Sequence, residues 1–143
     1  MSSARLEIGI LRSTLELLGI VLIRFRPAQR IWGTWLVAVN SAGVAFIDRI
    51  EAQVTLAAVA VALLLQALIY RRKRFIRLLG LTHVLWLPMI AWMLARLQTP
   101  TVGDGAFRAW LIALIITNAT CLLIDAWDAT RFARGERAPY YVW

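Results

Sequence analysis

Four long apolar stretches divide this chain, and short charged connections separate them. An α-helix that crosses about 30 Å of hydrocarbon needs about 17–25 predominantly apolar residues, and each stretch reaches that length. The pattern therefore predicts four transmembrane helices, at residues 31–47, 52–70, 78–95 and 106–134.

The N-terminal segment from Arg5 to Phe25 has a different pattern. Its polar or small residues recur every three or four positions and so share one stripe of a helix: Arg5, Gly9, Arg12, Glu16 and Gly19. We expect an amphipathic helix that lies in the membrane interface. The alternative is a fifth spanning helix with Arg12 and Glu16 paired inside the membrane, where a charge near the centre costs at least ~2.5 kcal/mol.

The composition agrees with a membrane protein. Of the 143 residues, 61% are hydrophobic, and the mean hydropathy is +0.70. Soluble domains are about 45–50% apolar, and a small domain buries only part of its surface. The chain is therefore expected to be an all-α integral membrane protein, with four transmembrane helices in a bundle and an N-terminal amphipathic interfacial helix. Residues 1–30 form that helix and a basic linker on the cytoplasmic face, residues 31–134 form the four-helix domain, and residues 135–143 form a cytoplasmic aromatic tail.

Basic residues are distributed unevenly around these helices. If the connection at 71–77 is cytoplasmic, thirteen Lys and Arg residues lie on that side and three on the other. Cytoplasmic segments carry this excess, so we expect both termini in the cytoplasm and the chain in the inner (plasma) membrane of a bacterial-type cell. The net charge of +8 then matches anionic lipid headgroups rather than nucleic acid. The expected headgroup and topology anchors are Arg24, Arg26, Arg30, Arg71, Arg72, Lys73, Arg74 and Arg77.

Individual residues predict how two of the helices pack. Ala58 and Ala62 form a small-xxx-small arrangement that allows close helix approach, so we expect residues 52–70 near the middle of the bundle. Pro88 removes a backbone donor and should kink the helix at 78–95.

The length of the last helix follows from its charges. Asp125 and Asp128 would be unfavourable at a helix C-terminus, where the dipole end is negative. Arg131 and Arg134 are favourable there, and Gly135 suits the position that follows a helix. We therefore expect one helix that continues to residue 134 and projects beyond the hydrocarbon.

Polar residues at membrane depth are the candidates for function. Asn40 lies midway along the first predicted spanning helix, and Asn118 lies midway along the last. Our preferred interpretation is hydrogen bonding between helices, and the alternative is a polar lining for water or a small solute.

A second polar group is expected one to two turns from the cytoplasmic face. It contains Gln66, Asp125 and His83, the one histidine of the chain. A neutral imidazole donates one hydrogen bond and accepts one, so Gln66 or Asp125 would orient it. We favour a structural cluster in which Asp125 pairs with Arg77 or with a neighbouring chain. Intramembrane ionisable groups are also functional candidates, and the alternative is a ligand or ion path along Asn40, Gln66, His83, Asn118 and Asp125.

The sequence predicts no cofactor. Haem usually takes two axial ligands, which argues against it in a chain with one histidine, whereas a quinone headgroup would fit beside His83. Asp125 and Asp128 form a weak DxxD pattern for a metal ion, but pairing of Asp128 with Arg131 at i,i+3 explains it without one. Cys121, the one cysteine, excludes an internal disulfide and is expected to be a packing residue.

Motifs of hydrolases, metalloproteases, P-loop proteins and dinucleotide-binding proteins are missing from the sequence. We therefore expect a protein that is not an enzyme. The predicted function is a small inner-membrane accessory or scaffold protein that associates with itself or with a larger membrane complex. The alternatives are a small oligomeric channel or transporter that uses the intramembrane polar residues, and a redox-complex subunit that borders a quinone site.

Overall fold

The computed structural model describes the backbone of residues 3–73, 77–103 and 105–136. Side chains are described within these ranges except at 3–8, 73, 77 and 78. Over this part of the chain the structure is helical and contains no strand, which confirms the all-α prediction.

The five α-helices are joined by shorter helical segments of other geometry. In chain order the elements are α1 (Ser3–Gly19), the π-helical segment η1 (Ile20–Arg24), α2 (Pro27–Ser41), the 3-10 segment η2 (Ala42–Phe46), α3 (Ile50–Lys73), the 3-10 segment η3 (Arg77–Leu85), α4 (Trp86–Arg96), the 3-10 turn η4 (Pro100–Val102) and α5 (Ala106–Ala133).

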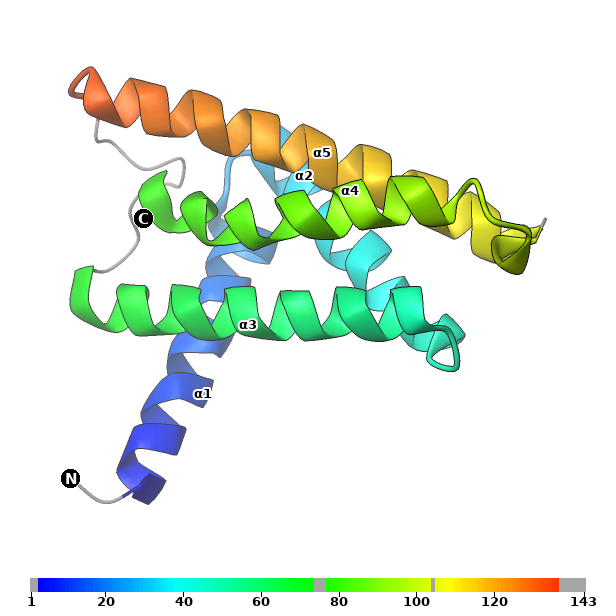
Figure 1. Cartoon of the computed structure of the whole chain (residues 1–143). Helices are drawn as coiled ribbons and strands as arrows, with labels where there is room; N and C mark the ends of the chain where they lie inside the picture. The colour runs from blue at the N-terminus through cyan, green and yellow to red at the C-terminus, as the bar shows by residue number, and fades with distance from the viewer. Residues whose placement is uncertain (1–2, 74–76, 104, 137–143) are drawn as a thin grey trace.

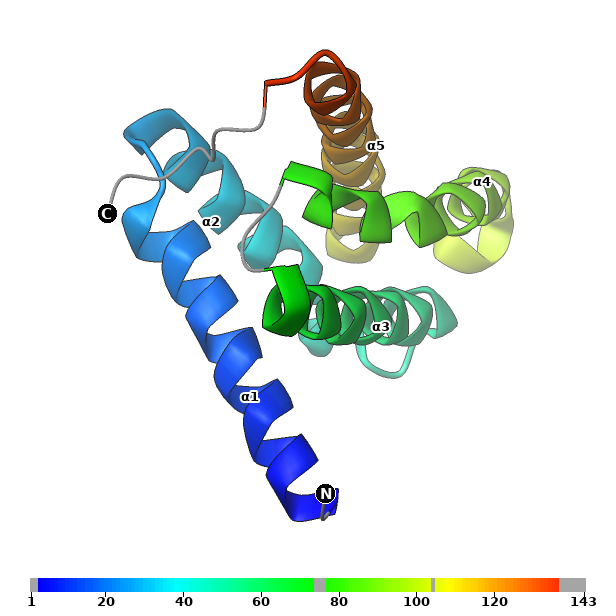
Figure 2. The ribbon, with the colours of Figure 1, turned by 90° about the vertical axis from the view of Figure 1, so that its left-hand side faces the viewer.

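Three of these helices run side by side, and α1 crosses them (Figure 1). α3, α4 and α5 extend in nearly the same direction, whereas α1 lies crosswise at the end of the bundle where α3 finishes. Figure 2 looks along α3, α4 and α5 and shows α1 running diagonally across that end. Leu17 of α1 and Ile20 of η1 pack there against Tyr70 and Leu79 in a small buried cluster.

Three segments are long and apolar enough to cross a membrane: Ile50–Arg72, Leu79–Arg96 and Ala106–Ala133. They correspond to the predicted spans at 52–70, 78–95 and 106–134. The predicted span at 31–47 is not confirmed, because the α-helical part of this segment, α2, has 15 residues before the chain tightens into η2. The structure thus supports membrane residence with three candidate spans.

The centre of the bundle is α5 rather than the alanine-rich α3. In an apolar 18-residue stretch of each span, 44% of the residues are buried in α5, against 22% in α3. Ala62 is buried as the small-xxx-small arrangement predicts, but three of the five leucines of α3 are exposed: Leu64, Leu65 and Leu68. The expectation that residues 52–70 lie at the middle of the bundle was therefore wrong.

Pro88 lies in the first turn of α4 and follows the 3-10 segment η3. A nitrogen in the first turn of an α-helix has no acceptor within that helix, so a proline there loses no hydrogen bond. Instead of a kink inside one α-helix, the chain changes from 3-10 to α geometry just before the proline. His83 therefore lies in the 3-10 segment η3 and not in an α-helix.

α5 is continuous to Ala133, in agreement with the argument from charges. Gly135 follows with φ of 95°, and its N–H donates to the Phe132 carbonyl at 3.0 Å. The N–H of Glu136 donates to the Arg131 carbonyl at 3.0 Å. These two bonds form a Schellman cap, which ends the helix two turns beyond Asp125.

The described anchor residues lie on the surface. Arg24, Arg26, Arg30, Arg71 and Arg72 are exposed. The other predicted anchors, the side chains of Lys73 and Arg77 and the whole of Arg74, lie outside the described residues, as does most of the C-terminal tail from 137 to 143.

Candidate functional site

One stripe of α5 carries the polar residues of the site. Asn118, Cys121, Asp125 and Asp128 follow one another at spacings of three, four and three, so they share one face of the helix. The same face continues towards the start of α5 through the fully buried Leu111 and Leu114. It therefore changes from apolar to polar along its length, and its polar half faces α1, α2 and η3.

His83 is the centre of a hydrogen-bonded chain that joins three elements. Its Nδ1 donates to Oδ2 of Asp125 on α5 at 2.9 Å, and its Nε2 accepts from Nε2 of Gln66 on α3 at 3.0 Å. The imidazole stacks on Trp86, with 4.2 Å between the ring centroids and 27° between the planes. Gln66, Asp125 and Trp86 together fix the position and the plane of the ring.

Cys121 lies next to this pair. Its Sγ is 3.6 Å from both Nδ1 of His83 and Oδ2 of Asp125. The three atoms form a compact group of one nitrogen, one sulfur and one oxygen, all of which are metal-ligand types. The side chains of His83 and Asp125 are only 13% and 15% exposed, so the group is largely shielded from the surroundings.

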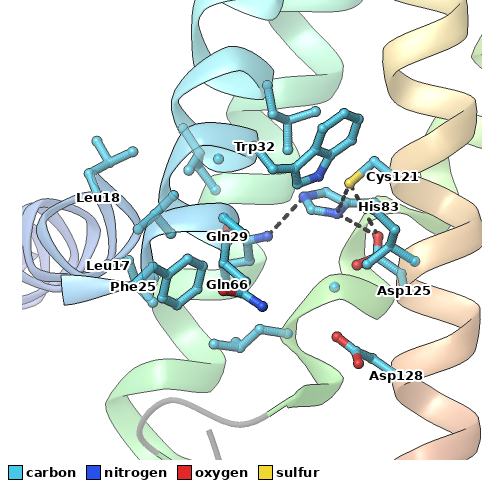
Figure 3. A pocket seen from close by; sticks show the side chains of 18 of the residues that line it. Leu17, Leu18, Phe25, Gln29, Trp32, Gln66, His83, Cys121, Asp125 and Asp128 are labelled. Atoms are coloured by element: carbon cyan, nitrogen blue, oxygen red, sulfur yellow. Dashed lines mark hydrogen bonds and ion pairs between the residues drawn. The ribbon is translucent and has the colours of Figure 1, made fainter. Parts of the chain in front are cut away.

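The group forms part of the wall of a cavity of about 450 Å³. Figure 3 shows Leu17 and Phe25 on the side of the cavity opposite His83 and Asp125. The apolar part of the wall comes from α1, η1, α2, α3 and α5: Leu17, Leu18, Val21, Leu36, Leu63 and Ile124. The polar part is Gln29, Gln66, His83, Cys121, Asp125, Asp128 and Arg131. A volume of about 300–1,000 Å³ with mostly apolar walls and a few convergent polar groups is typical of small-molecule sites.

The formal charges of the cavity wall are sparse and of mixed sign. Asp125 and Asp128 each bring a carboxyl group, and Arg131 brings a guanidinium that also binds Glu136, with Nη2 2.5 Å from Oε2. The two carboxyl groups disfavour an anionic occupant close to His83.

The two mid-helix asparagines form a separate contact. Asn40 Nδ2 donates to Asn118 Oδ1 at 2.9 Å, and Asn118 Nδ2 donates back to Asn40 Oδ1 at 3.1 Å. Both residues are buried, with 3% and 0% of their surfaces exposed. The amides satisfy each other between α2 and α5, which agrees with our preferred interpretation of hydrogen bonding between helices.

The predicted site residues thus fall into two groups. Gln66, His83 and Asp125 meet as expected, and Asn40 and Asn118 meet about two turns nearer the start of α5. The predicted partner Arg77 has a side chain outside the described residues, so its pairing with Asp125 stays a prediction.

Cys121 is buried in the core, as expected of a packing residue, but its position beside His83 and Asp125 was not predicted from the sequence. Its spacing of four from Asp125 was the available signal, because residues i and i+4 lie on the same helix face. The candidate metal ligands also differ from the DxxD pattern. In the described part of the chain, the group with suitable geometry is His83, Cys121 and Asp125, and Asp128 does not belong to it.

Comparison of the chain with known protein families, with curated proteins and with solved structures finds no match.

Proposed function

We propose that this protein binds a lipophilic small molecule with an uncharged hydrogen-bonding headgroup, in the cavity at the cytoplasmic end of a membrane bundle. The observation that carries the proposal is the hydrogen-bonded chain Gln66–His83–Asp125, which forms the polar end of a cavity of about 450 Å³ with apolar walls elsewhere. A headgroup at the polar end would exchange hydrogen bonds with these side chains. Its apolar remainder would contact the leucine-rich walls.

The placement in the membrane rests on length and charge. α2 has 15 residues, and η2, which continues it, has 5. At ~1.5 Å per α-helical residue and ~2.0 Å per 3-10 residue they span ~32 Å, which suits them as the fourth spanning segment. The exposed arginines beside α1 and at the end of α3 support a cytoplasmic position for that end of the bundle. Both termini would then be cytoplasmic and the membrane the bacterial-type inner membrane.

The crosswise position of α1 supports its role as an interfacial helix (Figure 1). Its Arg12 and Glu16 form an exposed i,i+4 pair with a distance of 2.8 Å, rather than a pair buried against the other helices. The exposed Leu11 and Leu15 lie one turn apart on a face that would enter the lipid boundary. In this arrangement α1 and η1 cover the cavity from the cytoplasmic side.

Quinones are the ligand class that this cavity suits best. A quinone has carbonyl oxygens that accept hydrogen bonds. The amide nitrogen of Gln66 carries two N–H groups, one of which donates to Nε2 of His83, and the second is a donor of the right kind. The carboxyl groups of Asp125 and Asp128 disfavour phosphate headgroups.

Binding can be measured by tryptophan fluorescence with the quinone analogue decylubiquinone. The purified full-length protein in lipid nanodiscs is titrated with the analogue, and saturable quenching is expected because Trp32 lines the cavity. Trp32→Phe should remove most of the saturable component. Trp127→Phe is the matched control, because Trp127 is 58% exposed on α5 and does not line the cavity.

A pair of glutamine variants tests the headgroup contact. Gln66→Leu should weaken binding about tenfold, the effect of one net hydrogen bond. Gln53→Leu should leave the affinity unchanged, because Gln53 is exposed at the opposite end of α3. Quenching that does not saturate, or that Trp32→Phe and Trp127→Phe reduce equally, would refute the proposal and indicate simple partition of the quinone into the lipid.

The predicted scaffold function and the channel alternative have separate tests. The many exposed leucines and isoleucines would face lipid in any membrane protein, so they do not favour a protein partner. Native purification in mild detergent followed by mass spectrometry tests the scaffold prediction through co-purifying chains. The channel alternative predicts that Asn40→Leu alters ion flux into proteoliposomes.

A further inference from the structure

The group of His83, Cys121 and Asp125 has a geometry that a hydrogen-bonded headgroup site does not require. One nitrogen, one sulfur and one oxygen from three side chains lie within 4.8 Å of one another. We propose that these three side chains bind a divalent transition-metal ion of the Zn²⁺ type, with a fourth coordination position open towards the cavity. This inference goes beyond the proposed function, because metal binding at this group does not depend on a quinone occupying the cavity.

The spacings of the three atoms match a tetrahedral site. Bond lengths of about 2.3 Å for Zn–S and about 2.0–2.2 Å for Zn–N and Zn–O give S···N and S···O separations of about 3.6 Å at tetrahedral angles. Cys121 Sγ lies 3.6 Å from both His83 Nδ1 and Asp125 Oδ2. Nδ1 and Oδ2 are 2.9 Å apart because a proton joins them, and a metal ion in its place would separate them to about 3.4 Å.

The charges of the ligands also suit a divalent ion. A thiolate, a carboxylate and a neutral imidazole carry two negative charges in total, so a divalent cation makes the group neutral. Neutrality matters because the ligands are largely buried and a net charge there would be costly. A metal ion would release the thiol proton, and the proton that lies between His83 and Asp125 would move to Nε2 of the imidazole, which stays neutral.

The surroundings of the ligands hold them in place. Gln66 contacts Nε2, the ring nitrogen that faces away from Cys121 and Asp125. With a metal ion on Nδ1, Nε2 of His83 carries the ring proton and donates a hydrogen bond to the amide oxygen of Gln66. A rotation of the Gln66 amide by about 180° brings this oxygen to the place of the amide nitrogen. Trp86 stacks on the imidazole and fixes its plane. A ligand with a fixed plane and a bonded second nitrogen is the usual arrangement of a metal-binding histidine.

Three protein ligands leave one position of a four-coordinate ion vacant, as in zinc sites that also bind water or substrate. All three ligands line the cavity, so the vacant position would face its interior (Figure 3). An oxygen atom of a cavity occupant would be able to take this position.

Cobalt(II) is the probe for this site, because a four-coordinate Co²⁺–thiolate centre has a near-ultraviolet charge-transfer band and intense visible d–d bands. The chelator-treated full-length protein in detergent micelles is titrated with Co²⁺, and both bands should saturate at one ion per chain. Excess Zn²⁺ should then remove them by displacement. These readouts need no quinone, so they separate the metal inference from the proposed function.

Substitutions assign the bands to the three ligands. Cys121→Ser, which keeps the size of the side chain, should remove the charge-transfer band, and His83→Ala should remove both bands. Gln66→Leu should weaken Co²⁺ binding about 10–100-fold, as loss of an outer-shell partner does. Asp128→Asn is the control with unchanged bands, because Asp128 lies one turn away on the same helix face and does not belong to the group.

Two results would overturn the metal site. One is the lack of any cobalt-dependent band in protein that remains monodisperse and helical. The other is a titration with the same affinity and spectrum in wild type and Cys121→Ser, which would place the cobalt elsewhere. The circular dichroism of each variant shows whether a lost band reflects a lost ligand or a lost fold.

Discussion

Gly80 on η3 packs directly against the carboxylate of Asp125 on α5, and a Cβ atom at residue 80 would overlap Asp125 Oδ1. The missing side chain allows η3 and α5 to approach until His83, three residues later, reaches the same carboxylate at 2.9 Å. The position of the polar group therefore depends on a residue that takes no part in its hydrogen bonds.

Gly80→Ala should displace Asp125 from His83. The inserted methyl group meets the carboxyl group itself, and overpacking of this kind typically costs about 1–3 kcal/mol. We expect a lower thermal midpoint in detergent and weaker Co²⁺ binding. Gly19→Ala is the matched control, because a Cβ there meets nothing within 4 Å and alanine favours the helix. An unchanged Co²⁺ affinity in Gly80→Ala would show that this contact does not position Asp125.

The Asn40–Asn118 pair predicts a non-additive pair of substitutions. Either Asn→Leu change alone leaves the other amide buried without its partner, which costs about 1–3 kcal/mol, whereas changing both removes the unpaired groups. The double variant should therefore be closer in stability to wild type than the sum of the single changes predicts. Thermal unfolding of the four proteins measures this cycle. Additive losses would mean that the two amides do not stabilise each other.

A third prediction concerns an ion pair at the end of the bundle away from the cavity. Arg96 Nε donates to Glu51 Oε1 at 2.7 Å, and the Glu51 side chain is 3% exposed. Removing one partner of a fully buried pair costs ~3–5 kcal/mol, and we expect about 2–3 kcal/mol for Glu51→Gln because Arg96 is 29% exposed. The control is Glu16→Gln, which breaks the exposed pair with Arg12. Exposed pairs contribute at most ~1 kcal/mol, so similar losses in both variants would contradict this ranking.

The residues that the sequence placed correctly are those governed by local rules. Gly135 and the arginines before it predicted the end of α5, because helix dipole and capping preferences act within one turn. Gln66 and His83 flank one short connection, so their similar depth followed from counting residues on each side. The direction in which α5 crosses the membrane was then enough to place Asp125 at the same depth as these two residues.

The cavity was not predictable because it depends on how helices approach one another. A Cβ at Gly33 would lie 2.5 Å from Val21 Cγ1, so this glycine sets the separation of α2 from η1. The sequence around a lone glycine in an apolar helix does not indicate which residue the glycine contacts. Glu51 and Arg96 are 45 residues apart and were assigned to different connections, which hid their ion pair. Contacts between distant elements follow from packing, which hydrophobic periodicity alone does not define.

The last prediction tests whether α1 lies in the interface or spans the membrane. In a Cys121→Ser background, spin labels are attached at Arg12→Cys, Leu15→Cys and Ile23→Cys, three positions that are exposed in the structure. A helix in the interface plane should place Leu15→Cys deeper than Arg12→Cys, because depth follows the face of the helix. A spanning helix would instead give depths that depend on distance along the helix axis, since each residue rises ~1.5 Å. Accessibility to oxygen and to a water-soluble nickel complex measures the depth of each label. A small difference in depth between residues 12 and 15, together with a several-fold larger difference between residues 12 and 23, would show that the helix crosses the membrane. That result would remove the proposed role of α1 as the cytoplasmic cover of the cavity.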